Sequence, residues 1–313
     1  MLKKAFIGID TSNYTTSFAI CDLDGNILKN YKILLPVKEG ERGLRQSDAV
    51  FAHIKNLPLI AKKIKEDSDR YEILAIGHSA YPRDVEGSYM PCFLVGKALS
   101  DILASLYKVD NYKFSHQAGH IRAAVYSSGA ITNKNFIAFH VSGGTTEILH
   151  VTIENNSYII DLLGGSNDLH AGQAIDRIGV KMGFSFPCGK VIEASALEFC
   201  GKVPTKKISR DGLYVNLSGL ENMALKLYSE TDNKPLVSRF VLNYIAKAIV
   251  EMSDAYIEKF GKTHFVYAGG VMSNSIIKQI LKEKFECSFA EPAMSADNAV
   301  GIAYLAKRAY ENK

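Results

Sequence analysis

Short apolar runs alternate along the chain with longer stretches in which apolar residues recur every three or four positions. Runs of the first kind are typical of buried strands and stretches of the second kind of helices. The pattern predicts strands at residues 6–9, 17–21, 27–34, 73–77, 136–140, 147–153, 158–162 and 264–268. It predicts helices at 49–64, 93–107, 170–182, 221–229, 237–259, 274–284 and 296–310, with loops at 39–47 and 78–91 and a loop-rich stretch at 184–218. Strands that alternate with helices indicate an α/β fold.

Two of the predicted strand pairs repeat one pattern. Phe6–Ile20 aligns without a gap with Phe136–His150, at a constant offset of 130 residues. Each copy is an apolar strand, a hydroxyl-rich turn and a second apolar strand, and such a turn offers N–H groups and hydroxyls to a phosphate. One such hairpin is common, but the repeat favours a duplicated domain that grips one nucleotide from both sides. We expect domains at 1–130 and 131–295, with a helix at 296–313 that closes the first.

Composition narrows the class of protein. The 313 residues are 47% hydrophobic and 22% charged, as in ordinary globular proteins. A net charge of +4 permits a nucleic-acid partner without arguing for one. The basic stretch from Lys202 to Arg210 is the best local candidate for contact with a phosphate backbone, although taken alone it is more typical of a solvated loop.

The cysteines and the apolar runs bear on the compartment. Five scattered cysteines without a C-x-x-C pair offer no zinc knuckle or disulfide framework and fit a reducing cytoplasm. No apolar run approaches the ~18 residues of a membrane span, and we find no signal peptide. We therefore expect a cytoplasmic protein that does not act at a membrane.

The most specific local pattern is H-Q-A-G-H at residues 116–120. Residues four apart lie one above the other on a helix, so the imidazoles of His116 and His120 can point at one ion. Two unrelated polar histidines give the same pattern, so a metal site needs a third ligand. A metalloprotease of the H-E-x-x-H type has glutamate after the first histidine, whereas this chain has Gln117, so we reject hydrolysis by that mechanism.

Other polar or glycine-rich positions are candidates for the same chemistry. Asp297 either caps the last helix or returns with it to the histidines. After the strand at 264–268, Gly269 and Gly270 let a ring or phosphate approach the backbone, unless they only form a tight turn. Asn274 can cap the next helix or touch a ribose. Asp176, on the helix at 170–182, lies beside a glycine that suggests close packing.

Six motifs, in this order, resemble the TsaD/Gcp/Kae family of tRNA threonylcarbamoyladenosine synthases, within the actin-like ATPase (ASKHA, ribonuclease H-like) superfamily. They are G-I-D-T-S at 8–12, H-Q-A-G-H at 116–120, V-S-G-G at 141–144, A-G-Q-A-I-D-R at 171–177, A-G-G-V-M-S-N at 268–274 and D-N-A at 297–299. The resemblance covers nearly the whole chain. It implies two actin-like domains with a nucleotide cleft between them.

The resemblance also implies a site. His116, His120 and Asp297 would hold a divalent metal, and two imidazoles with one carboxylate suit Fe²⁺ or Zn²⁺. The residues that would line the site of ATP, AMP or a threonylcarbamoyl-adenylate are His140, Val141, Ser142, Gly143, Gly144, Asp176, Gly189, Gly269, Gly270 and Asn274. Ser12 and Thr15 are candidate phosphate contacts. The implied partners are tRNA and TsaB-like accessory proteins.

The chain departs from the family's motifs at several positions. The family's C-D-E-T after the first motif is N-Y-T-T at 13–16, which removes an acidic pair. The glutamates of H-x-E-G-H and A-G-E-A are Ala118 and Gln173, V-S-G-G-H-T has Thr145 in place of histidine, and the lysine of S-F-S-G-L-K is Glu221. Residues 81–91 replace a G-P-G loop.

Three readings follow from these departures. The first is a threonylcarbamoyl transferase that acts on tRNA. The second is a carbamoyltransferase with another acceptor, and the third is a nucleotide- or metal-binding partner protein with weak catalysis. The missing acids favour the second and third, and the retained metal motifs favour the first and second. No reading is that of a peptidase.

Overall fold

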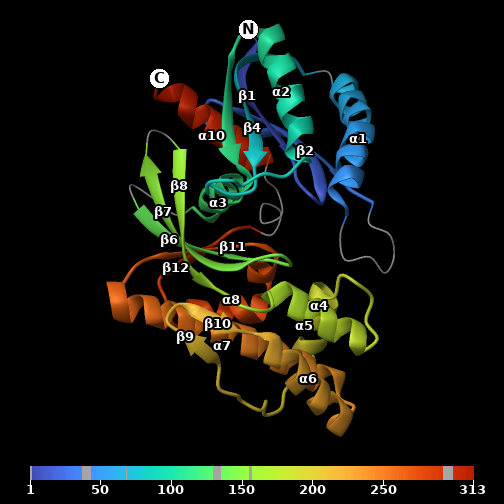
Figure 1. Ribbon diagram of the computed structural model, residues 1–313, viewed down its shortest axis with the longest axis vertical. Coiled ribbons are helices and arrows are strands. Elements are labelled where there is room, and N and C mark those ends of the chain that lie inside the picture. The colour runs from blue at the N-terminus through green and yellow to red at the C-terminus, as the bar shows by residue number, and fades with distance from the viewer. Residues whose placement is uncertain (1, 37–43, 68, 130–134, 155–156, 292–298) are drawn as a thin grey trace. The chain divides into compact units, whose positions relative to one another are not determined.

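The computed structural model describes residues 2–36, 44–67, 69–129, 135–154, 157–291 and 299–313, and it has the predicted α/β fold (Figure 1). Contacts divide the chain into two compact units. Unit 1 comprises Met1–Tyr126, Thr152–Ile160 and Ala296–Lys313, and unit 2 comprises Ser127–Val151 and Asp161–Ser295. In the described part of the chain, no helix is long and apolar enough to cross a membrane.

A five-stranded sheet forms the centre of unit 1. Its strands are β1 (Lys3–Thr11), β2 (Thr15–Asp22), β3 (Ile27–Leu34), β4 (Tyr71–Tyr81) and β5 (Asp110–Ser115), in the order β3-β2-β1-β4-β5. The first three strands are antiparallel, whereas β4 runs parallel to β1 and β5. The predicted first hairpin is thus β1 and β2.

Helices α1 (Gln46–Glu66) and α2 (Phe93–Tyr107) cover one face of this sheet (Figure 1). Ile60 of α1 and Ala104 of α2 share a core with Ile9 of β1. The start of α2 is anchored by Thr11, whose Oγ1 donates to the Cys92 carbonyl at 2.9 Å and accepts from the Gly96 N–H at 3.1 Å. Burial of apolar side chains and two hydrogen bonds therefore fix α2 to the end of β1.

Helix α10 (Ala299–Glu311) covers the opposite face. A Cβ on Gly8 of β1 would lie 2.0 Å from the Ala299 carbonyl oxygen, so the backbones are in contact there. Successive residues of a strand point to opposite faces, so Gly8 and Asp10 face α10, whereas Ile9 faces α1 and α2. Residues of the sheet's two faces thus meet helices from distant parts of the sequence.

Unit 2 repeats the sheet of unit 1, which confirms the predicted duplication. This second sheet has the strands β6 (Asn135–Val141), β7 (Thr146–Glu154), β8 (Ser157–Gly165), β11 (Phe265–Ala268) and β12 (Cys287–Phe289), in the order β12-β11-β6-β7-β8. Read from the other edge, this order matches β3-β2-β1-β4-β5 strand for strand. The adjoining ends of β7 and β8, within Thr152–Ile160, are assigned to unit 1. β1 ends at Thr11 and β6 ends at Val141, which is the offset of 130 found in the sequence.

The helices of unit 2 pack around one long, largely buried helix, α7 (Lys234–Phe260). The others are α4 (Ala171–Lys181), α5 (Gly189–Leu197), α6 (Ser218–Thr231) and α8 (Ser275–Lys282), with a short 3-10 helix, η1 (Gly270–Ser273), after β11. Val241, Ile245 and Ile249 of α7 are buried in a core shared with β6 and β11.

The sequence pattern was wrong about two loops. Residues 78–81 continue β4, because they pair with β5 from Lys113 to Ser115 although the segment is polar. The stretch 184–218 contains α5 and a hairpin of β9 (Ser209–Asp211) and β10 (Tyr214–Asn216). The turn residues before α5 hid a helix of nine residues whose buried side, Ile192 and Ala196, packs into the core.

Candidate functional site

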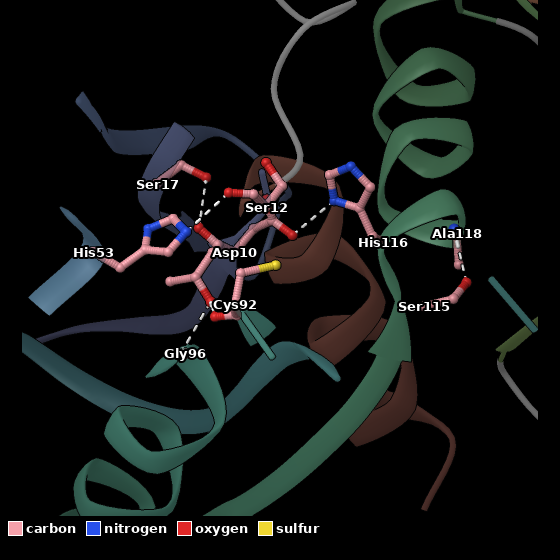
Figure 2. A network of polar contacts seen from close by, with 10 residues as sticks. Asp10, Ser12, Ser17, His53, Cys92, Gly96, Ser115, His116 and Ala118 are labelled. Atoms are coloured by element: carbon pink, nitrogen blue, oxygen red, sulfur yellow. Dashed lines mark hydrogen bonds and ion pairs between the residues drawn. The ribbon is translucent and has the colours of Figure 1, made fainter. Parts of the chain in front are cut away.

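The two histidines of the H-Q-A-G-H motif lie on the first turns of α3 (His116–Ser128), which follows β5 directly. Ser115 stabilises the start of this helix, since its Oγ accepts from the Ala118 N–H at 3.0 Å (Figure 2). The same hydroxyl donates to Oδ2 of Asp84 at 2.5 Å. The Gln117 N–H donates to the Pro82 carbonyl at 3.1 Å. Residues of the loop that replaces the family's G-P-G loop therefore hold the first turn of α3. Burial raises the pKa of the Asp84 carboxyl.

The imidazoles of His116 and His120 lie together. Their ring centroids are 4.7 Å apart and the planes are nearly perpendicular. Nδ1 of His116 lies 2.9 Å from Oδ1 of Asp10, which is 1% exposed at the end of β1 (Figure 2). The predicted third ligand, Asp297, lies outside the described residues. Among the residues that the structure describes, no group of three or more His, Cys, Asp or Glu side chains could hold a metal ion.

Helix α10 begins beside this pair of histidines. A Cβ on Gly301 would lie 1.8 Å from the carbonyl oxygen of Gly119, so α3 and α10 cross in backbone contact between the two histidine positions. Gly119 of the H-Q-A-G-H motif therefore has a packing role, because it lies where α3 and α10 are in contact. The first described residue of α10, Ala299, is two positions after Asp297.

The turn of the first hairpin carries Ser12 and Thr15, the candidate phosphate contacts. Ser12 is buried, and its carbonyl accepts from Nε2 of His53 at 2.9 Å. Because a carbonyl cannot donate, Nε2 carries the proton and Nδ1 accepts from the Thr16 hydroxyl at 2.8 Å. Burial lowers the pKa of His53. A neutral imidazole of α1 therefore holds this turn in place.

The corresponding turn of unit 2 carries Ser142, Gly143 and Gly144. It is closed by the Ser142 N–H, which donates to the Thr145 carbonyl at 2.9 Å, and by a 2.7 Å contact between the Ser142 and Thr145 hydroxyls. Both glycines are exposed, and a Cβ on either would meet nothing within 4 Å. Packing of the described residues therefore does not require glycine at either position.

The two glycines after β11 differ from one another. Gly269 has a φ of +97°, and a Cβ there would lie 2.3 Å from the Val141 carbonyl oxygen, so the fold requires this glycine. Gly270 is exposed, with open space where a Cβ would lie. Asn274 caps α8, because its Oδ1 accepts from the N–H groups of Ile276 and Ile277, both at 3.1 Å.

The remaining candidates of unit 2 lie on neighbouring elements. His140 is buried in β6 opposite Ala268 of β11. A Cβ on Gly172, in the first turn of α4, would lie 2.6 Å from the Ser142 carbonyl oxygen, so α4 starts against the glycine turn. The structure thus brings together Val141, Ser142, Gly143 and Gly269.

Asp176 and Gly189 meet at the start of α5. Asp176 lies on α4, one turn after Gly172. Its Oδ1 accepts from the Cys188 N–H at 2.7 Å, which stabilises the N-terminus of α5. Burial raises the pKa of Asp176. Gly189 is exposed with open space around it. Asp176 therefore has a structural role. At Gly189, as at Gly270, the packing of the described residues does not require glycine.

The structure gives partners to one substituted residue and adds two residues to which the sequence assigned no role. Glu221, which stands in place of the lysine of the family's motif, pairs with Lys181 at 2.6 Å and Arg177 at 3.4 Å, so its charge is compensated locally. The additional residues are Asp10 and His53. A buried carboxylate inside an otherwise apolar strand is unusual, and that contrast was the available signal for Asp10.

Comparison with known proteins decides the family. The model of the family described as "TsaD: tRNA N6-adenosine threonylcarbamoyltransferase" matches residues 39–304. The chain belongs to the TsaD family. It is 26% identical to a tRNA N6-adenosine threonylcarbamoyltransferase of Neorickettsia sennetsu (strain ATCC VR-367 / Miyayama), over 98% of this chain and 94% of the relative. The family is one of transferases that act in tRNA modification.

Solved structures agree on the fold. The component A of (R)-2-hydroxyglutaryl-CoA dehydratase from Acidaminococcus fermentans has a TM-score of 0.57 at 12% identity, over 98% of this chain and 99% of its own. The activator of the 2-hydroxyisocaproyl-CoA dehydratase from Clostridium difficile, with bound ADPNP, has a TM-score of 0.55 at 13% identity, over 98% and 96%. HypF of T. kodakarensis has a TM-score of 0.59 at 13% identity over 99% of this chain, which spans 48% of HypF. The TsaD homologue thus has the actin-like ATPase fold that the motifs implied.

The neutral His53 makes stability depend on pH. Its pKa in the folded protein lies below the value of about 6.5 of an unfolded chain. As the pH falls below about 6.5, the unfolded chain takes up a proton that the folded protein does not, so the free energy of unfolding decreases. We expect a smaller decrease in His53→Gln, which does not titrate. Urea unfolding at several pH values from neutral to mildly acidic measures this, and parallel curves for both proteins contradict it.

Proposed function

We propose that this TsaD homologue transfers a threonylcarbamoyl group from a threonylcarbamoyl-adenylate to N6 of an adenosine in tRNA. The observation that carries the proposal is the family match over residues 39–304, which includes most of the motifs. The neighbouring imidazoles of His116 and His120 support it. Action on tRNA agrees with a cytoplasmic location.

The proposed metal ligands are His116, His120 and Asp297. Two observations support them: the imidazoles lie together on α3, and α3 crosses the start of α10 in backbone contact. Two neutral nitrogens and one carboxylate suit Zn²⁺ or Fe²⁺ and leave coordination positions for substrate or water. When bound, such an ion polarises the oxygen atoms of a substrate.

The proposed nucleotide site is the cleft between two actin-like domains, at 1–130 and 131–295, with residues 296–313 closing the first. Gly143, Gly144, Gly189 and Gly270 support it, because the packing of the described residues does not require glycine there. A flat adenine or a phosphate can approach bare backbone more closely than it can approach a side chain. The remaining proposed contacts are His140, Val141, Ser142, Asp176, Gly269 and Asn274, with Ser12 and Thr15 at the phosphates. The bound ADPNP of the dehydratase activator supports an adenine nucleotide.

A protein partner is also part of the proposal. Six large apolar side chains on α1 and α2 are between 48% and 73% exposed: Phe51, Ile54, Leu59, Leu94, Ile102 and Leu106. Those of α2 recur at intervals of eight and four residues, so they lie on one side of the helix. Exposed apolar patches commonly mark protein interfaces. A TsaB-like accessory protein is the occupant that the family resemblance implies.

The metal ligands are tested by His120→Ala. We expect about one metal ion per chain in the parent protein and a large loss in the variant, because one of the ligand nitrogens is removed. Metal content by mass spectrometry after purification measures this. His264→Ala is the control, since His264 is an exposed histidine beside Ser288 in unit 2. Unchanged stoichiometry in His120→Ala refutes the site.

The nucleotide site is tested by Gly270→Val. The side chain would enter the space that we assign to the ligand, so binding of ATP and AMP should be abolished while the fold is retained. Calorimetric titration measures binding, and thermal unfolding checks the fold. Gly219→Val, at an exposed glycine near the start of α6, is the matched control. Normal affinity in Gly270→Val counts against the site.

The reaction is tested by complementation of a strain that lacks its own synthase, with the modified nucleoside measured by mass spectrometry. We expect weak activity from this chain alone, because the turn at Asn13–Thr16 has no carboxylate and a positioned acid or base commonly contributes ~10²–10⁴-fold in rate. Tyr14 and Thr15 are not appreciably ionised at neutral pH. Co-expression of an accessory protein should raise the activity. Full restoration by the chain alone shows that the missing acids do not matter.

A further inference from the structure

We propose that Asp10 is the positioning residue of the metal centre: it holds the proton of His116 on Nδ1 and so leaves the lone pair of Nε2 for the metal ion. The inference rests on the proposed function for the metal ligands, to which it adds a residue. It concerns the orientation and tautomer of one imidazole, and both can be measured without turnover.

The contact itself is well defined. Oδ1 of Asp10 lies 2.9 Å from Nδ1 of His116, within the range of a hydrogen bond to a charged acceptor (Figure 2). The Asp10 side chain is 2% exposed and that of His116 is 24% exposed. The aspartate is therefore shielded from water, whereas the imidazole reaches a partly open surface. A carboxylate can only accept, so the hydrogen atom of this bond belongs to Nδ1.

A neutral imidazole carries a single N–H group, so fixing it on Nδ1 determines the chemistry of the other nitrogen. Nε2 is then the unprotonated nitrogen, which is the form that a metal ion binds. Metal-binding histidines commonly donate their second ring nitrogen to a carboxylate, which fixes the ring and raises its basicity. The buried negative charge of Asp10 also favours a cation nearby.

The fold explains how Asp10 reaches α3. On β1, Gly8 and Asp10 point to the face that α10 covers, and Gly8 lets α10 lie against the strand. The same helix crosses α3 at Gly119 and Gly301. The C-terminal end of β1 therefore directs the Asp10 carboxylate at the first turn of α3, although the two residues are 106 positions apart in the sequence.

Among the described residues, the apolar core of unit 1 offers no polar partner that would offset the cost of burying the Asp10 carboxylate. The neighbours of Asp10 on β1, Ile9 and Thr11, pack against the opposite face, and the core of that face is apolar. The Asp10 side chain itself is 2% exposed, and burial of an ionised side chain costs free energy unless it is paired. In the described part of the chain, the Asp10 carboxylate is paired with His116, the histidine that we assign to the metal, so we assign a function to the pair.

The test compares Asp10→Asn with the parent protein. The asparagine keeps the shape, but its amide can donate to Nδ1, which favours the tautomer with the proton on Nε2. We expect the Zn²⁺ affinity, measured by competition with a chelator, to fall about 10–100-fold. Asp10→Glu keeps an acceptor and should restore part of the affinity. Ser17→Ala is the matched control, because its hydroxyl donates to the main-chain oxygen of Asp10 at 3.3 Å and not to the carboxylate.

A second measurement needs no variant and no metal. Long-range ¹H–¹⁵N spectra of the metal-free parent protein should show His116 with its proton on Nδ1, and those of Asp10→Asn should show it on Nε2. A parent imidazole protonated only on Nε2 overturns the inference, even if Asp10→Asn does not fold. So does a Zn²⁺ affinity of Asp10→Asn within twofold of the parent.

The failure of this inference is distinguishable from failure of the proposed metal site. If the metal site is wrong, His120→Ala keeps its metal. If only the role of Asp10 is wrong, His120→Ala loses its metal while Asp10→Asn binds Zn²⁺ normally and keeps the parent tautomer.

Discussion

The arrangement of unit 1 depends on backbone contact between α10 and the elements beneath it. Gly8 of β1, Gly77 of β4 and Gly301 of α10 leave no side chain where a Cβ would lie between 1.8 and 3.1 Å from its nearest neighbours. These glycines let α10 lie deep against β1 and β4 and cross α3 at Gly119. Both the histidines of α3 and the carboxylate of Asp10 are placed by this packing. The candidate metal centre is therefore a product of how closely three backbones approach.

The sequence was informative where a signal is local. Apolar runs located β1 to β4, β6 to β8 and β11 but missed the edge strands β5 and β12. The offset of 130 residues revealed the duplication, and the spacing of His116 and His120 predicted two imidazoles on one side of a helix. The start of α5 was missed because the turn residues before it also occur at helix starts. The extension of β4 was missed because pairing with β5, and not the polarity of its own residues, makes it a strand.

Contacts between distant residues had no local signal. Asp10 and His116 are 106 residues apart, and His53 meets the carbonyl of Ser12 across 41 residues. The roles of the glycines could not be told from the sequence either. Gly269 and Gly270 are adjacent, yet packing against Val141 requires the first to be glycine, whereas a Cβ on the second would lie in open space. Short motifs identified the family without separating glycines that the fold requires from those that it does not.

Unit 1 combines the strands β1 to β5 with a helix, α10, that follows unit 2 in the sequence, and this bears on the order in which the chain can fold during synthesis. Domains usually fold as units, the N-terminal one first, as the chain leaves the ribosome. Here β1 to β5 emerge early, but α10 emerges after all the strands and helices of unit 2. Until then, the face of the first sheet that carries Gly8 and Gly77 is not covered by α10. The unit whose strands are made first is thus completed after unit 2, and the histidines of α3 acquire their neighbour α10 only after the strands and helices of unit 2 have been made.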